Sequence, residues 1–191
     1  MITQPQLPSK KQGRARETLF RVAYQQQGHL IQVADYKANM IISICTMIIS
    51  AIIAIIGYGV VTGRGESYVP LLIAPVLMIV LSCLISLIIA IRAASPKFIS
   101  GKNDPGVEHR SSLLYFGVIA DLDQQEYVGK MKAMLSDEDV IFEQMTLDIY
   151  NQGIVLRKKY NLLRDAYHVL LFGFVLSVTV FLVTFLFSYM L

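Results

Sequence analysis

The sequence predicts an all-α membrane protein with three transmembrane helices, the first and third extended into the cytoplasm as long amphipathic helices, plus a small helical cytoplasmic region. Of its 191 residues, 54% are hydrophobic and only 16% are charged, whereas a soluble domain carries about a quarter charged residues. Its mean hydropathy is +0.53. Three blocks, 38–63, 67–91 and 166–191, contain no Asp, Glu, Lys or Arg. Each exceeds the roughly 20 residues that a helix needs to cross a bilayer, which excludes an ordinary cytosolic protein.

These blocks divide the chain into segments. The first block begins only after 37 residues and is too long for the apolar core of a cleavable signal, so we expect a retained anchor. The expected segments are a disordered basic N-terminus over 1–16, a cytoplasmic amphipathic helix over 17–37, transmembrane helices over 38–62, 67–91 and 166–191, and a cytoplasmic region over 92–165.

Basic residues beside the blocks predict the orientation. Six Lys or Arg precede the first block, only Arg64 lies between the first and second, and ten lie between the second and third, eight of them near the ends of those two blocks. Positive charge is retained on the cytoplasmic side. We therefore expect a multi-pass protein of the plasma membrane with its N-terminus and region 92–165 in the cytoplasm and its C-terminus outside.

Two amphipathic patterns lead into the first and third blocks. Both repeat at steps of three and four residues, as one face of a helix does, and we expect the two helices to lie parallel. A Ser136–Asp139 capping pair predicts where the second begins. The first pattern comprises Leu19, Ala23, Gln26, Leu30 and Val33, and the second Met145, Ile149, Gln152, Leu156, Tyr160, Leu163 and Tyr167.

Gln26 and Gln152 interrupt these two patterns with amides. Buried amides need hydrogen-bond partners, so the two side chains would either fix the register between helices or contact a polar ligand. Between the second and third blocks, Asp123 is a candidate N-cap for a short helix ending near Leu135. The apolar segment 112–117 is expected to fold back on the long helices.

The residues needed for catalysis are not grouped in this sequence. The three histidines are scattered without a zinc spacing, and no glycine-rich loop is followed by Lys-Ser or Lys-Thr. We therefore expect no enzyme, no metal site, no cofactor and no nucleic-acid binding. The charge-free blocks also argue against ion-coupled transport. They carry small residues at steps of four that permit close helix packing within the chain or between copies: Thr46, Ser50 and Ala54; Ser82, Ser86 and Ala90; Gly173 and Ser177.

An ordered set of short motifs runs along residues 24–175. The motifs are Gln26-Gln27-Gly28-His29-Leu30 and Ala34-Asp35-Tyr36-Lys37-Ala38; Leu113-Leu114-Tyr115-Phe116-Gly117 with Glu126-Tyr127; and Ile149-Tyr150, Lys158-Lys159-Tyr160, Leu163-Arg164 and Ala166-Tyr167. In order and spacing this set resembles the transmembrane effectors of Pycsar anti-phage systems, and it departs from the family pattern at Asn151-Gln152-Gly153.

The resemblance implies a function. A companion cyclase would make cyclic CMP or cyclic UMP, and this chain would sense that activating ligand through its cytoplasmic region and impair the bacterial inner membrane, causing abortive infection. A homo-oligomer in the lipid bilayer is expected. A phosphate needs basic groups and a base needs aromatic and amide groups, so the ligand-binding candidates are Arg157, Lys158, Tyr160, Arg164, Asp35, Lys37, Gln26 and Gln152.

Other roles remain open for these residues. The basic side chains could instead serve membrane topology and contact lipid headgroups, and Asp35 and Lys37 could form juxtamembrane ion pairs. The alternative function for the whole chain is a non-catalytic structural or assembly subunit of a membrane complex, which predicts a fixed protein partner and no response to a nucleotide.

Overall fold

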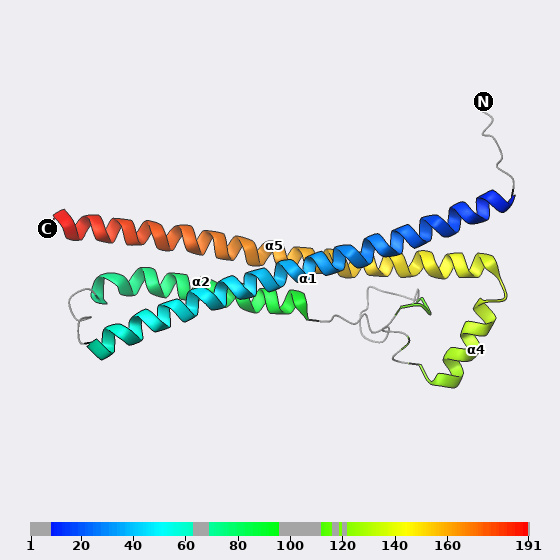
Figure 1. The fold of residues 1–191 in the computed structure, drawn as a ribbon, viewed down its shortest axis with the longest axis horizontal. Coiled ribbons are helices and arrows are strands. Elements are labelled where there is room, and N and C mark those ends of the chain that lie inside the picture. Colours follow the sequence, from blue (N-terminus) through cyan, green and yellow to red (C-terminus); the bar gives the residue numbers. More distant parts are fainter. Residues whose placement is uncertain (1–8, 63–68, 96–111, 116–118, 120–121, 191) are drawn as a thin grey trace, which may run out of the picture. The chain divides into compact units, whose positions relative to one another are not determined.

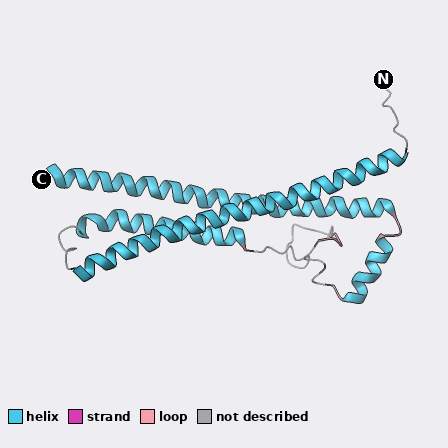
Figure 2. Cartoon of the chain, viewed as in Figure 1, coloured by secondary structure: helices cyan, strands magenta, loops and turns pink. Residues whose placement is uncertain are grey.

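The computed structural model is α-helical, and among the residues that it describes there is no strand (Figures 1 and 2). It describes residues 9–62, 69–95, 112–115, 119 and 122–190. The elements are α1 (Ser9–Thr62), α2 (Val69–Ala94), α4 (Gln124–Met134) and α5 (Glu138–Met190). The predicted all-α fold with three helices long enough to cross a membrane is confirmed, and α1 and α5 each continue well beyond a membrane span; the cytoplasmic location of these extensions stays a prediction.

Helix α1 is longer than the sequence predicted. It begins at Ser9, so residues 9–16 are helical although we expected residues 1–16 to be unstructured; residues 1–8 lie outside the described chain. Lysine, arginine, glutamine and alanine are good helix formers, and one glycine lowers helix stability by only about 1 kcal/mol. Gly13 and Gly28 therefore do not interrupt α1.

The chain divides into two compact units, and α1 and α5 each contribute to both. Unit 1 contains residues up to Gln32 and Pro96–Arg157; unit 2 contains Val33–Ser95 and Lys158–Leu191. The division within α1 and α5 falls before the expected membrane boundaries at residues 38 and 166. Asp35 and Tyr160 consequently belong to the unit that contains the apolar helices.

In unit 1, α1 and α5 run parallel. The rings of Phe20 and Phe142 stack with their centroids 5.4 Å apart, and the guanidinium of Arg16 lies 5.8 Å from the centre of the Phe142 ring. One turn further along α1, the Tyr24 hydroxyl lies 3.5 Å from the carbonyl oxygen of Met145. Both helices advance together, as the amphipathic patterns predicted.

A short segment of unit 1 docks on α5. Ser112 is fully buried; its hydroxyl donates to the carbonyl oxygen of Gln144 at 3.0 Å, and the Gln144 side chain accepts from the amide of Leu113 at 3.0 Å. The expected folding back of this segment is confirmed on α5, while Phe116 and Gly117 lie outside the described residues.

The helix starts in unit 1 are capped by aspartates. Asp123 accepts from the amide of Gln125 at 3.2 Å and caps α4, as predicted. At the start of α5 the predicted cap was wrong. Asp137 accepts from the amide of Asp139 at 3.0 Å, whereas the Ser136 hydroxyl donates to the carbonyl of Ala133 at the end of α4. The connection between these helices is only three residues long, 135–137, which makes Ser136 part of the preceding turn.

In unit 2, α2 packs antiparallel to α5 through small residues. Ser86 donates to the carbonyl oxygen of Ala166 at 2.8 Å, and Ser177 donates to that of Pro75 at 2.8 Å. Gly173 lies so close to α2 that a Cβ there would overlap the side chain of Ser82. The small residues of α2 and α5 therefore serve packing within the chain, as small residues do in membrane helices.

The apolar helices are mostly uncovered. Three helices within the described ranges are long and apolar enough to cross a membrane, and only 11%, 22% and 6% of their most apolar windows is buried. Thr46, Ser50 and Ala54 of α1 are among the exposed residues. A hydrophobic surface of this extent requires lipid or further protein around it.

Candidate functional site

Unit 1 contains a group of polar side chains at the contact between α1 and α5. This polar cluster consists of Tyr24 and Gln27 on α1 with Asp148 and Gln152 on α5. Each pair is spaced to share a helix face. Asp148 is only 3% exposed, and Tyr24, Gln27 and Gln152 are half-buried. A buried carboxylate is destabilising unless it is well hydrogen-bonded, so its partners decide what the cluster does.

The hydrogen bonds of the polar cluster are incomplete. Gln152 Nε2 donates to Oδ2 of Asp148 at 2.7 Å. Oδ1 of Asp148 and Oε1 of Gln27 are both buried and accept no hydrogen bond from the part of the chain that the structure describes. Burial raises the pKa of Tyr24, and hydrogen bonding and charge repulsion from Asp148 raise it further. The single hydroxyl proton of Tyr24 is shared between the Met145 carbonyl and the Asp148 carboxylate, so Oδ1 of Asp148 and Oε1 of Gln27 remain without a donor from the described chain.

A second group of polar side chains lies in unit 2, on the first residues that α1 and α5 contribute to that unit. This juxtamembrane cluster consists of Asp35 and Lys37 on α1 with Lys159 and Tyr160 on α5. Lys159 forms an ion pair with Oδ1 of Asp35, and the ammonium of Lys37 lies 5.5 Å from the centre of the Tyr160 ring. The Lys159 side chain is 7% exposed and that of Asp35 is 42% exposed, so the pair is open to water on the α1 side.

The structure brings together three of the residues chosen from the sequence and separates others. Asp35, Lys37 and Tyr160 meet in the juxtamembrane cluster, and Gln152 joins the polar cluster. Gln26 is exposed; the neighbouring Gln27 takes the inward position. Arg157, Lys158 and Arg164 are exposed on α5, and Arg164 lies 3.8 Å from the carboxylate of Asp165.

Sequence reasoning missed Tyr24, Gln27, Asp148 and Lys159. One signal was present for Asp148, which is the sole acidic residue between Glu143 and Asp165 and is followed within four residues by two amides. Lys159 shares a face with Leu163 and Ala166 at steps of four and three, both of them buried. That pattern distinguishes it from Lys158.

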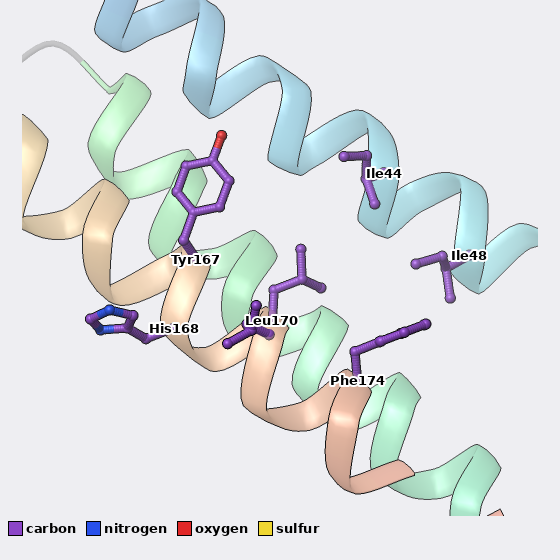
Figure 3. Close-up of a pocket in the computed structure, with 7 residues that line it drawn as sticks. Ile44, Ile48, Tyr167, His168, Leu170 and Phe174 are labelled. Atoms are coloured by element: carbon purple, nitrogen blue, oxygen red, sulfur yellow. The ribbon is translucent and has the colours of Figure 1, made fainter. Parts of the chain in front are cut away.

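Unit 2 also has an apolar groove between α1 and α5 (Figure 3). Its volume is about 370 Å³. Ile44 and Ile48 of α1 and Phe174 of α5 point toward the space between the two helices, whereas the ring of His168 points away from α1. Leu170, Leu171 and Tyr167 complete the lining. The lining contains no Asp, Glu, Lys or Arg, and it fits an acyl chain or an apolar side chain.

The fold and these clusters define a class of protein. The chain is an integral membrane protein of three apolar helices, two of which continue as long helices into a polar unit. Over residues 19–187 the chain matches the Pycsar effector protein domain. Because that match covers most of both units, the chain belongs to the Pycsar effector protein family, whose members are transmembrane effectors of Pycsar anti-phage defence.

The other two comparisons gave no relatives. Neither the curated proteins nor the solved structures compared with the chain include a match. The family assignment confirms the resemblance found in the sequence motifs.

Proposed function

We propose that this effector senses cyclic CMP or cyclic UMP, made by a companion cyclase, and responds by impairing the bacterial inner membrane. The observation that carries the proposal is the family match over residues 19–187, which includes the polar unit as well as the apolar helices. Growth of an infected cell would then stop before the phage matures. The chain would act through binding and rearrangement, without catalysis.

The continuity of α1 and α5 supports a coupling mechanism. Each helix contributes uninterrupted residues to both units. A ligand that binds one arrangement of the unit 1 helices better than another shifts the population toward that arrangement. Since the same helices continue as membrane spans, a rearrangement of α1 and α5 in unit 1 would be passed on to the apolar segment through a continuous helix.

The exposed surface of the spans supports self-association as the response. Most of the apolar windows is uncovered in a single chain, and Thr46, Ser50 and Ala54 present small side chains outward on α1. Small residues allow close approach of helix backbones in lipid. Assembly of several copies would open a pore or disorder the surrounding lipid.

Basic residues on α5 are the proposed contacts for the nucleotide phosphate. Arg157, the last residue of unit 1 on α5, is exposed and lies within two turns of the polar cluster residue Gln152. Lys158, the next residue, is exposed where unit 2 begins. Arg164, in unit 2, is more distant from that cluster along α5 and is better placed to contact lipid headgroups. In the proposed orientation the basic N-terminus lies in the cytoplasm. The unit 1 parts of α1 and α5 would then lie on the side of the membrane where the nucleotide is made.

The proposal is tested with the full chain in detergent and in cells. Calorimetric titration should show binding of cyclic CMP or cyclic UMP, and cells that express the chain with an active cyclase should take up a membrane-impermeant dye. A catalytically dead cyclase is the matched control and should give no uptake. Absence of binding to both nucleotides, with a fixed protein partner co-purifying, would contradict sensing and favour the assembly subunit.

A further inference from the structure

The polar cluster of unit 1 has an excess of buried acceptors. Asp148 is 3% exposed and its Oδ1 accepts no hydrogen bond from the described chain, nor does Oε1 of Gln27. Buried oxygens without donors destabilise a fold, and such groups are few in native proteins. Packing of α1 against α5 gives no reason for two of them in one contact. A bound group that supplies N–H donors would account for both.

The two oxygens belong to the same part of the helix contact. The Asp148 carboxylate interacts with the Tyr24 hydroxyl, and Gln27 lies one helical turn beyond Tyr24 on the same face of α1. Nε2 of Gln27 lies 3.9 Å from the position that a Cβ on Gly153 would occupy, five residues beyond Asp148 on α5. Both side chains therefore approach α5 within about one and a half helical turns of each other.

Gly153 lies beside the cluster. A Cβ built on Gly153 would meet a single neighbouring atom within 4 Å, Nε2 of Gln27 at 3.9 Å. Helix packing therefore does not require a glycine at this position, and a methyl group would fit beside the Gln27 amide. The neighbouring Gln152 already uses its amide nitrogen on Oδ2 of Asp148, which holds the carboxylate in place.

We propose that the polar cluster binds the cytosine edge of the activating nucleotide, so that the chain prefers cyclic CMP to cyclic UMP. This inference rests on the proposed function. The exocyclic amine of cytosine donates two hydrogen bonds, and aspartate accepts from this amine in nucleic-acid recognition. Uracil carries a carbonyl oxygen at the same position. That oxygen would face Oδ1 of Asp148 and Oε1 of Gln27 without a proton between them.

The first test compares the two nucleotides on the unaltered full-length chain by titration calorimetry. Cyclic CMP is expected to bind at least tenfold more tightly than cyclic UMP, a difference of about 1.4 kcal/mol. Equal affinity, or tighter binding of cyclic UMP, would overturn the inference while leaving nucleotide sensing intact. If neither nucleotide binds, the proposed function fails, and the inference fails with it.

The second test uses Gln27→Met and Asp148→Asn. Methionine fills the volume of glutamine and removes an oxygen that lacks a donor, so Gln27→Met should keep or raise the thermal unfolding temperature while weakening cyclic CMP binding at least tenfold. Asp148→Asn replaces an acceptor by an amide that can donate to the uracil carbonyl, so it should narrow the preference for cyclic CMP.

Exposed neighbours supply matched controls. Gln26→Met repeats the Gln-to-Met change, and Glu143→Gln likewise replaces a carboxylate by its amide, both at exposed positions of the same helices. Both variants should bind cyclic CMP as the unaltered chain does. If Gln27→Met folds with unchanged helix content and binds cyclic CMP normally, the polar cluster is a structural contact and the inference is wrong.

Discussion

Two glycines of α5 have opposite surroundings. At Gly153 a Cβ would have only Nε2 of Gln27 within 4 Å, at an ordinary contact distance, whereas at Gly173 it would overlap the Cβ and Oγ of Ser82 on α2. The first glycine weakens a helix without serving packing, since glycine lowers helix stability relative to alanine. The second permits a close approach of two membrane helices.

This difference predicts opposite effects of the same substitution. Gly153→Ala should stabilise the protein by about 0.5–1 kcal/mol, and Gly173→Ala should destabilise it by about 1–3 kcal/mol through overpacking against Ser82. Thermal unfolding in detergent followed by circular dichroism measures both. Gly28→Ala, where nothing lies within 4 Å, is the control and should resemble Gly153→Ala. Equal effects at positions 153 and 173 would contradict the assigned α2–α5 contact.

Tyr24 predicts a pH dependence of stability. Burial and the Asp148 carboxylate raise the pKa of this hydroxyl above its ordinary value of 10.0. Above pH 10 the Tyr24 hydroxyl loses its proton in the unfolded chain but keeps it in the folded chain. The contribution of Tyr24 to the free energy of unfolding is therefore fully present below pH 10 and is lost as the pH rises above it. Tyr24→Phe should reduce the loss of unfolding temperature measured between about pH 9 and pH 11.

An exposed tyrosine separates this effect from general alkaline denaturation. Tyr150 on α5 is 67% exposed, and Tyr150→Phe should leave the pH profile of the unfolding temperature unchanged. If Tyr24→Phe and Tyr150→Phe alter the pH profile of the unfolding temperature equally, Tyr24 contributes no more to the pH dependence of stability than an exposed tyrosine does.

At the scale of helices, the Lys159–Asp35 ion pair joins α5 to α1. Its two ends differ in exposure, with 7% for the Lys159 side chain and 42% for that of Asp35. Asp35→Asn leaves a buried ammonium without its carboxylate and should destabilise the protein by about 1–3 kcal/mol, less than for a fully buried pair because water screens the exposed side. Lys159→Met leaves a carboxylate that water can reach and should cost less, about 0–1 kcal/mol.

The surface pair on α4 gives the reference for that comparison. Lys130 and Glu126 lie 2.7 Å apart, and both side chains are about half exposed. Lys130→Met should change the unfolding free energy by no more than about 0.5 kcal/mol. If Asp35→Asn lowers the unfolding free energy by no more than Lys130→Met does, the ammonium of Lys159 is hydrated in the folded protein.

The helices were predictable from the sequence, but their inward faces were not. Three charge-free blocks and two periodic patterns predicted the spans, the long helices and their parallel course. The predicted inward face of α1 included Leu19 and Gln26, whereas Leu19 is 67% exposed and the inward positions are Phe20 and Gln27. One residue corresponds to a rotation of 100°.

The reason for this offset is that polar residues occupy inward positions. Periodicity assigns apolar residues to the interior and polar residues to the surface. Here Gln27, Asp148 and Lys159 contact the partner helix, so a pattern rotated by one residue fits the apolar residues nearly as well. The candidate site was therefore only partly predictable: Asp35, Lys37, Tyr160 and Gln152 were chosen, while their partners depend on how α1 meets α5.

At the scale of the whole molecule, charge and span number together predict the topology. An odd number of spans puts the two termini on opposite sides of the membrane, and the excess of Lys and Arg before the first span and between the second and third predicts that these regions are cytoplasmic. The proposed ligand sensing in unit 1 requires this orientation, since the proposed companion cyclase would make the nucleotide inside the cell.

Single cysteines at the two ends of the helices test that orientation. Thr62 at the end of α1 and Ser95 directly after α2 are both exposed, and the native Cys45 and Cys83 are fully buried, so they should contribute little background. A membrane-impermeant maleimide should label Thr62→Cys in intact spheroplasts and Ser95→Cys only after permeabilisation. The reverse pattern would invert the topology, place unit 1 outside the cell and rule out sensing of a cytoplasmic nucleotide by α1 and α5.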